Sequence, residues 1–122
     1  MATKAQIPTN VTAENCAASA ANNTVVSATL NLTAQDAAII TVQITNGATP
    51  PTTSTVVQVM HSCDGGTTWQ LIDSGTAGLV ASQIYSFRWS YGPEVGMIAL
   101  WFGQNTGQSV TVGAQCYAAS LL

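Results

Sequence analysis

Charged side chains are scarce in this 122-residue chain, which has two basic and five acidic residues. Charged residues make up only 6% of it, against about 25% in an ordinary soluble domain. Lys4 and Arg88 are the only basic residues, and a nucleic-acid-binding protein needs many more to displace the counterions of the phosphates. The composition therefore excludes nucleic acid as a partner and leaves solvation of the surface to Thr, Ser, Asn and Gln.

The shortage of charge has two interpretations. Ordinary monomers use charge to stay apart, so a neutral surface is expected of a chain that works inside an assembly, where neighbours cover it. Neutral polar surfaces also occur in many β-proteins that do not assemble. Composition alone leaves both interpretations open.

Long apolar runs and paired cysteines are also missing. No run approaches the roughly 20 residues of a membrane helix, so no membrane is expected as a partner. The start, "MATKAQIPTN", has no apolar region of the kind found in secretory signals, which predicts folding in a cytoplasm. Cys16, Cys63 and Cys116 are odd in number and widely spaced, which fits neither a disulfide framework nor a zinc site. We therefore expect no metal, no cofactor and thiols without a chemical role.

What the chain does contain is apolar residues, 47% of the total, in a pattern with a period of two. Alternating segments lie at 25–32, 38–45, 85–91 and 109–118, and such alternation is typical of strands that are wet on one side. Two further strands are expected at 54–61 and 67–73, leading into and out of a turn. The segment "MIALWF" at 97–102 is apolar on both faces, which predicts a central strand. The fold class predicted is all-β: an antiparallel β-sandwich or jelly roll of about seven to eight strands.

The first 22 residues lack this pattern and are rich in Ala, Thr and Asn. We expect residues 1–22 to form an extended or flexible arm and residues 23–122 to form the sandwich. Few large apolar groups are available to order such an arm. It is instead suited to adding a strand to the sheet edge of a neighbour, with Ile7, Pro8 and Val11 as candidate partner contacts.

The stretch "HSCDGGTTWQ" at 61–70 carries the densest turn signal. Its predicted structural turn consists of Ser62, Asp64, Gly65, Gly66, Thr68 and Trp69. Glycines accept a positive φ and an aspartate accepts hydrogen bonds from the backbone ahead of it. The spacing S-x-D-x-G-x-T-W resembles the Asp-box of sialidase-type propellers, which is a folding element remote from the active site. A propeller needs repeated blades, and this chain has one box, so no catalytic residue carries over.

Catalytic chemistry has little support elsewhere. His61 is the only histidine and is predicted to be a strand-end residue satisfied by hydrogen bonds. Tyr85, Phe87, Trp89 and Tyr91 form an aromatic stripe at strand spacing. Three interpretations stay open for this stripe: the core face of a sheet, a subunit interface, or a platform that stacks sugar rings. Tyr85, Phe87 and Trp89 are therefore further candidate partner contacts.

A wider resemblance runs roughly from Thr24 to the end. A strand followed by "DGGTTW", a second strand, the "YSFRW" strand and the late segment "NTGQSVTVGAQCY" resemble small β-sandwich structural proteins of tailed bacteriophages. The resemblance implies a non-enzymatic virion component, a capsid decoration (cement) protein that binds copies of itself, as a trimer, and the major capsid protein. It also implies assembly into the virion in the host cytoplasm. The alternative is a carbohydrate-binding module or an adhesin at a phage fibre or tail tip.

Overall fold

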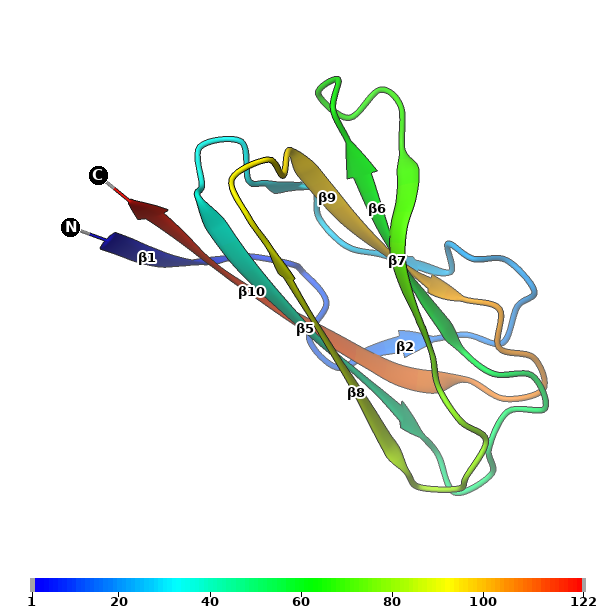
Figure 1. Cartoon of the computed structure of the whole chain (residues 1–122). Helices are drawn as coiled ribbons and strands as arrows, with labels where there is room; N and C mark the ends of the chain where they lie inside the picture. The colour runs from blue at the N-terminus through cyan, green and yellow to red at the C-terminus, as the bar shows by residue number, and fades with distance from the viewer. Residues whose placement is uncertain (1, 122) are drawn as a thin grey trace.

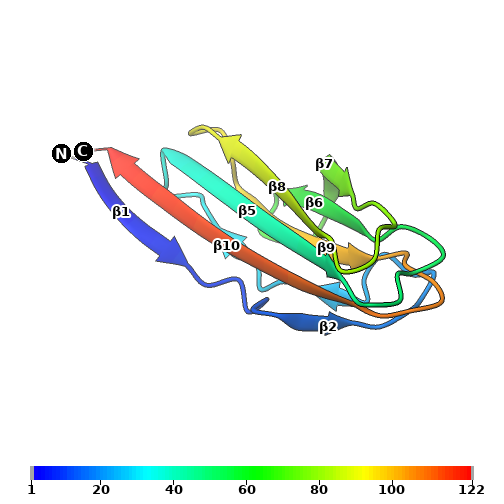
Figure 2. The same cartoon turned by 90° about the horizontal axis from the view of Figure 1, so that it is seen from below.

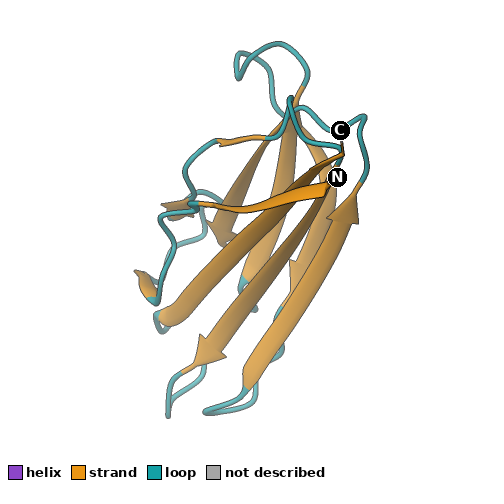
Figure 3. Cartoon of the chain, turned by 90° about the vertical axis from the view of Figure 1, so that its left-hand side faces the viewer, coloured by secondary structure: helices purple, strands orange, loops and turns teal. Residues whose placement is uncertain are grey.

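A computed structural model describes residues 2–121 as two antiparallel sheets packed face to face, without a helix among these residues (Figure 1; Figure 3). The strands are β1 (Ala2–Ile7), β2 (Glu14–Cys16), β3 (Val25–Val26), β4 (Leu30–Asn31), β5 (Ala37–Asn46), β6 (Val56–Ser62), β7 (Gln70–Thr76), β8 (Ile84–Tyr91), β9 (Met97–Gly103) and β10 (Val110–Leu121). The predicted all-β sandwich is confirmed.

The strand order is that of a jelly roll. Sheet A has the order β1-β10-β5-β8, with β2 also paired to β10, and sheet B has the order β3-β9-β6-β7, with β4 also paired to β9. Since β1 and β2 share one neighbour, and β3 and β4 share another, the ten strands fill eight positions. The pairs β1/β2 with β10, β3/β4 with β9, β5 with β8 and β6 with β7 form one long antiparallel ribbon folded over both sheets. Both termini lie at one end of this ribbon (Figure 2).

The core lies between the sheets and is built from alternate positions of the strands. The largest fully buried side chains are Phe102, Leu30, Leu32, Ile40, Ile44, Ile98, Leu100, Val11, Val42, Val57, Val59 and Val112. Burying each of these contributes about 1.5–3 kcal/mol. Strand β9 lies between β6 and the short strands β3 and β4, and it is buried on its inner side at Leu100 and on its outer side at Ala99. This is the central strand that the two-sided apolar pattern predicts.

The aromatic stripe of β8 faces sheet B and packs against the core. The rings have room because two residues that face them are glycines: Gly75 in β7 and Gly78 just after β7. A Cβ on Gly75 would lie 2.6 Å from Cδ1 of Phe87, and a Cβ on Gly78 would lie 2.5 Å from the hydroxyl of Tyr85. The rings thus fill the gap between the edge strands β7 and β8, and the stripe is not presented to solvent as a flat platform.

Tyr91, the last member of the stripe, closes this gap with a polar contact. Its hydroxyl donates a hydrogen bond of 2.6 Å to Oδ2 of Asp73 on β7. Burial, together with this hydrogen bond, raises the pKa of Tyr91 far above its usual range. The neutral phenol therefore persists in the folded chain and links the two sheets at their open side.

The amino-terminal segment is part of sheet A. Strand β1 pairs with β10 from Ala2↔Leu121 to Ile7↔Cys116, and β2 pairs with the other end of β10. Between these strands Val11 is buried in the core, and Cys16 at the end of β2 is fully buried as well. No break in packing therefore lies at residue 22, where the arm was expected to end. Composition alone suggests an unpaired segment, because it does not reveal the backbone hydrogen bonds that join β1 and β2 to β10.

Two truncations separate the contributions of this segment. Deleting residues 1–7 removes a strand whose side chains at positions 3–6 are exposed, so the domain should still unfold cooperatively with a modestly lower Tm. Deleting residues 1–16 also removes Val11 and Cys16 from the core and should cost at least about 3 kcal/mol. Thermal unfolding followed by circular dichroism compares the two with the full chain. Equal stability of the two truncated chains would show that residues 8–16 do not belong to the sandwich.

Candidate functional site

The turn at 62–69 is closed by its own hydrogen bonds. The Ser62 hydroxyl donates to Oδ1 of Asp64 over 2.7 Å and accepts from the backbone N–H of Gly66 over 2.9 Å. The same Oδ1 accepts from the backbone N–H groups of Thr67 and Thr68, over 3.1 and 2.8 Å. Gly65 and Gly66 have φ values of 77° and 94°, a region that disfavours other residues. The Ser62 hydroxyl and Oδ1 of Asp64 thus hold the turn closed, as the sequence predicts.

The exposed carboxylate of Asp64 has an unusually low pKa. Hydrogen bonds from the backbone of Thr68 and the hydroxyl of Ser62 lower it from 3.8 to about 2. On the other side of the turn, a Cβ built on Gly66 would lie 3.6 Å from Cζ2 of Trp69, so the indole ring lies against Gly66. The Ser62 hydroxyl and Oδ1 of Asp64 therefore act within the turn itself, as a folding element does.

His61 is the residue before the end of β6, and it is hydrogen-bonded to the link between β8 and β9. Its Nε2 accepts a 2.8 Å hydrogen bond from the backbone N–H of Gly96, in the link between β8 and β9. Its Nδ1 lies 3.7 Å from Sγ of Cys63. These contacts place His61 as the hydrogen-bonded strand-end residue that the sequence predicts.

The cysteines are three free thiols. Burial raises the pKa of Cys16 and of Cys116 to about 11, and Cys63 is exposed. Within residues 2–121, histidine, cysteine, aspartate and glutamate side chains form no group of three that could hold a metal ion. The same residues include no helix of the length and hydropathy needed to cross a membrane.

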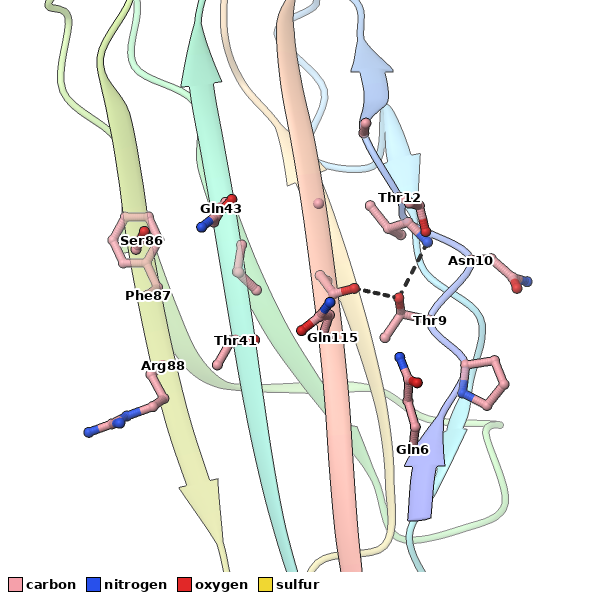
Figure 4. Close-up of a pocket in the computed structure, with 16 residues that line it drawn as sticks. Gln6, Thr9, Asn10, Thr12, Thr41, Gln43, Ser86, Phe87, Arg88 and Gln115 are labelled. Atoms are coloured by element: carbon pink, nitrogen blue, oxygen red, sulfur yellow. Dashed lines mark hydrogen bonds between the residues drawn. The ribbon is translucent and has the colours of Figure 1, made fainter.

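A groove of about 1030 Å³ lies on the outer face of sheet A. Its floor is formed by β10, β5 and β8, and its wall by the link between β1 and β2 (Figure 4). The polar side chains that line it are Gln6, Thr9, Asn10, Thr12, Thr41, Gln43, Ser86, Arg88 and Gln115. Antiparallel pairing places Gln115, Thr41 and Arg88 in one row across three strands, and Gly113, Gln43 and Ser86 in the next. The floor is thus a neutral array of amides and hydroxyls with one guanidinium at its rim.

The wall of the groove is rigidly attached. The Thr9 hydroxyl donates to the carbonyl of Ala114 over 2.8 Å, and the Ala114 N–H donates to the carbonyl of Val11 over 2.9 Å. Two wall residues that are not glycine, Asn10 and Ala13, have positive φ values of 60° and 54°. Surrounding contacts must hold such conformations in place. The groove is therefore formed before any ligand arrives.

The outer face of sheet B has a different character. We call the surface formed by Val26, Met60, Leu71, Met97, Ala99 and Trp101 the sheet B face; cross-strand pairing places these residues together opposite the core. Val26 and Leu71 are 49% and 54% exposed, and Trp101 is half-buried. No member of the sheet B face is charged. Met60 and Ala99 in its middle are buried, and Gln58 pairs with Trp101 on the same face. Its exposed apolar side chains are therefore Val26 and Leu71 at the two edges of the sheet, with Trp101 partly exposed beside Val26.

The sequence-predicted partner contacts are dispersed in the structure. Ile7 is partly buried, Pro8 is exposed at the groove wall, and Val11 lies in the core and is unavailable to a partner in this fold. Phe87 and Trp89 stack on each other with their centroids 6.0 Å apart on the inner face of β8. Sequence reasoning missed the groove and the sheet B face. Both could have been looked for among the residues at the outward positions of the alternating strands, which form the outer faces of the two sheets.

Comparisons with known proteins support the fold and assign no family. No family model and no curated protein matches the chain. A structure of infectious bursal disease virus, Gt strain, is similar with a TM-score of 0.58 and 9% identity, covering 98% of this chain and 32% of that one. The SPBc2 prophage-derived protein YomS is similar at a TM-score of 0.46 and 15% identity, covering 98% and 94% of the two chains. A structure described as "CBM4 structure and function" is similar with a TM-score of 0.44 and 14% identity. The similarity covers 80% of this chain and 59% of that one.

Substitutions at Asp64 test the structural role of the turn. Asp64→Ala removes the acceptor for two backbone N–H groups and should lower the Tm by about 3–8 °C at neutral pH. Asp64→Asn keeps an acceptor without the charge and should lower it less. Thermal unfolding measures the Tm of both variants. Glu14→Gln is the control, because it neutralises an exposed carboxylate that is not part of a turn.

The pH dependence gives a second, independent readout. A carboxylate whose pKa falls on folding stabilises the native state above its unfolded pKa, and that contribution disappears as the pH drops from about 4 to about 2. The wild-type Tm should therefore fall more steeply over this range than the Tm of Asp64→Asn. Parallel curves for the two proteins, or an unchanged Tm for Asp64→Ala at neutral pH, would contradict the structural assignment.

Proposed function

We propose that this chain is a non-enzymatic structural protein of a phage particle, a capsid decoration (cement) protein that attaches through the sheet B face. The observation that carries the proposal is the presence of exposed apolar side chains on that face with no ionised group among its members: Val26 and Leu71 are about half exposed at the two edges of the sheet, and Trp101 is partly exposed beside Val26. The jelly-roll fold is compatible with this role, and the low charge of the whole chain supports it.

The physical basis is burial of apolar surface without desolvation of charge. Each Å² of apolar area removed from water contributes about 25 cal/mol, and a face without ionised groups avoids the cost of burying unpaired charges. A single patch of this size supports modest affinity. A protein that binds many equivalent positions, with several copies joined to each other, gains affinity through multivalency.

The proposed partners are further copies of this chain and the major capsid protein. A closed oligomer, a trimer around a threefold axis, covers apolar surface that otherwise promotes uncontrolled association. The segment expected as an arm has less freedom to contribute than its composition suggests, because its backbone is committed to β10. The sheet B face is therefore the principal contact in this proposal.

Quantitative mass spectrometry of purified particles tests the assignment. A decoration protein should be present in hundreds of copies, in a fixed ratio to the major capsid protein. A handful of copies would place the chain in a tail or fibre, and absence from the particle would overturn the proposal altogether.

A charge placed on the sheet B face should prevent attachment. Leu71→Glu puts a carboxylate at a half-exposed position where a neighbour would bury it, which should weaken particle binding at least tenfold. Thr111→Glu is the matched control, since Thr111 is an exposed position on the outer face of sheet A. Co-sedimentation with particles that lack the protein measures both, with circular dichroism to verify folding. Equal binding of the two variants would exclude the sheet B face as the attachment surface.

A further inference from the structure

The outer face of sheet A carries an uneven share of the charge. Both basic residues are there: Arg88 at the groove rim and Lys4 beside the pocket described next. The residues that line the groove and this pocket include no Asp or Glu. The acidic side chains lie on the edge strand β2, ahead of β5, in the turn after β6, on β7 and in the link after β8: Glu14, Asp36, Asp64, Asp73 and Glu94. Asp36 belongs to the end of this face that carries Lys4, because its backbone and its carboxylate are hydrogen-bonded to Ala119 and Leu121 of β10. The positive charge is therefore least compensated around Arg88, and it favours an anionic ligand there.

A second, smaller pocket lies on the same face, nearer the ends of the chain. It has a volume of about 280 Å³ and is lined by Tyr117, Ile39 and alanines of β5 and β10, with Lys4 beside them. The Tyr117 side chain is 48% exposed and lies two positions along β10 from Gln115, on the same face. A half-exposed aromatic ring thus lies beside the groove, in a row between those of Lys4 and Arg88.

From this arrangement we infer that the outer face of sheet A binds an acidic polysaccharide, a chain of sugar rings that carry carboxylates. Glutamine amides both donate and accept hydrogen bonds, as vicinal hydroxyl groups require, and Gln6, Gln43 and Gln115 present three of them. A guanidinium binds a carboxylate through two parallel hydrogen bonds, which is the role of Arg88. The exposed ring of Tyr117 offers an apolar surface to the face of a sugar ring.

The geometry suits an extended ligand. Tyr117 and Arg88 belong to adjacent rows on β10 and β8, with β5 between them. Strand spacing and residue rise place their Cα atoms about 12 Å apart. Since the groove wall is fixed by the hydrogen bonds of Thr9 and Val11, little ordering cost is added on binding. A rigid, shallow site of this length fits several consecutive sugar units.

Other polyanions fit less well. An extended peptide gains affinity mainly by pairing its main chain with an open sheet edge, whereas the groove floor includes β5 and β10, which are paired on both sides. Nucleic acid requires many phosphate contacts, and this face has two cations. The inference does not depend on the proposed attachment to a capsid, because the sheet B face lies on the opposite side of the sandwich and leaves this face free.

Binding of short oligogalacturonates, measured by isothermal titration calorimetry at low salt, tests the inference on the full chain. Wild-type protein should bind them and should lose affinity as salt is raised. It should bind neutral galactan oligosaccharides and poly-glutamate at least tenfold more weakly. Failure to bind oligogalacturonate, or equal binding of the neutral sugar, would overturn the inference. Equal binding of poly-glutamate would show that charge alone is recognised and would overturn the assignment to a saccharide.

Paired variants localise the site. Arg88→Gln and Tyr117→Ser should each reduce affinity for oligogalacturonate about tenfold or more, while Arg88→Lys should recover only part of the loss and Tyr117→Phe should bind as wild type. Both substituted positions, Arg88 and Tyr117, are exposed, and thermal unfolding verifies that each of the four variants keeps the fold. Unchanged affinity in both Arg88→Gln and Tyr117→Ser would move any observed binding away from this face and refute the proposed site. Neither variant touches the sheet B face, so failure here leaves particle attachment as a separate result.

Discussion

The antiparallel register between β10 and β5 is the constraint on which the rest of this structure depends. It runs without interruption from Val110↔Asn46 to Ala119↔Ala37. Because side chains alternate between the faces of a sheet, a slip of one residue would exchange every inward and outward position. The register sends Val42 and Val112 into the core and Gln43 and Gln115 to the solvent. The same pairing therefore determines both the stability of the fold and the composition of the groove.

The scarcity of charge acts differently on the two sides of the sandwich. Sheet A keeps its outer face soluble with amides and hydroxyls, and adds the two cations of the chain. Sheet B has an outer face with exposed aliphatic side chains and no ionised group on the surface defined above. A chain with ordinary charge content would have distributed lysines and glutamates over both. The exposed apolar side chains of sheet B and the polar face of sheet A allow two different contacts to be proposed for one small domain.

Sequence patterns predicted what is local and missed what is not. The period of two located the long strands, and "MIALWF" was placed in the middle of a sheet because both of its faces are apolar. The turn around Asp64 was predicted because its donors and acceptors lie within seven residues. The amino-terminal segment was expected to stand apart, since its composition reveals neither the backbone bonds to β10 nor the burial of Val11. The groove was missed because Gln115, Thr41 and Arg88 become neighbours only through cross-strand pairing.

The central claim is that the sandwich turns its apolar side toward the particle and its polar side outward. A cryo-electron microscopy map of the intact particle tests this most directly, because the two faces are distinguishable once the jelly roll is fitted. The account predicts density for this domain on the outer shell, with Leu71 and Trp101 against a neighbouring subunit and with Tyr117 and Arg88 toward solvent. A map in which the sheet B face is open to solvent, while the groove is covered by a capsid subunit, would contradict it.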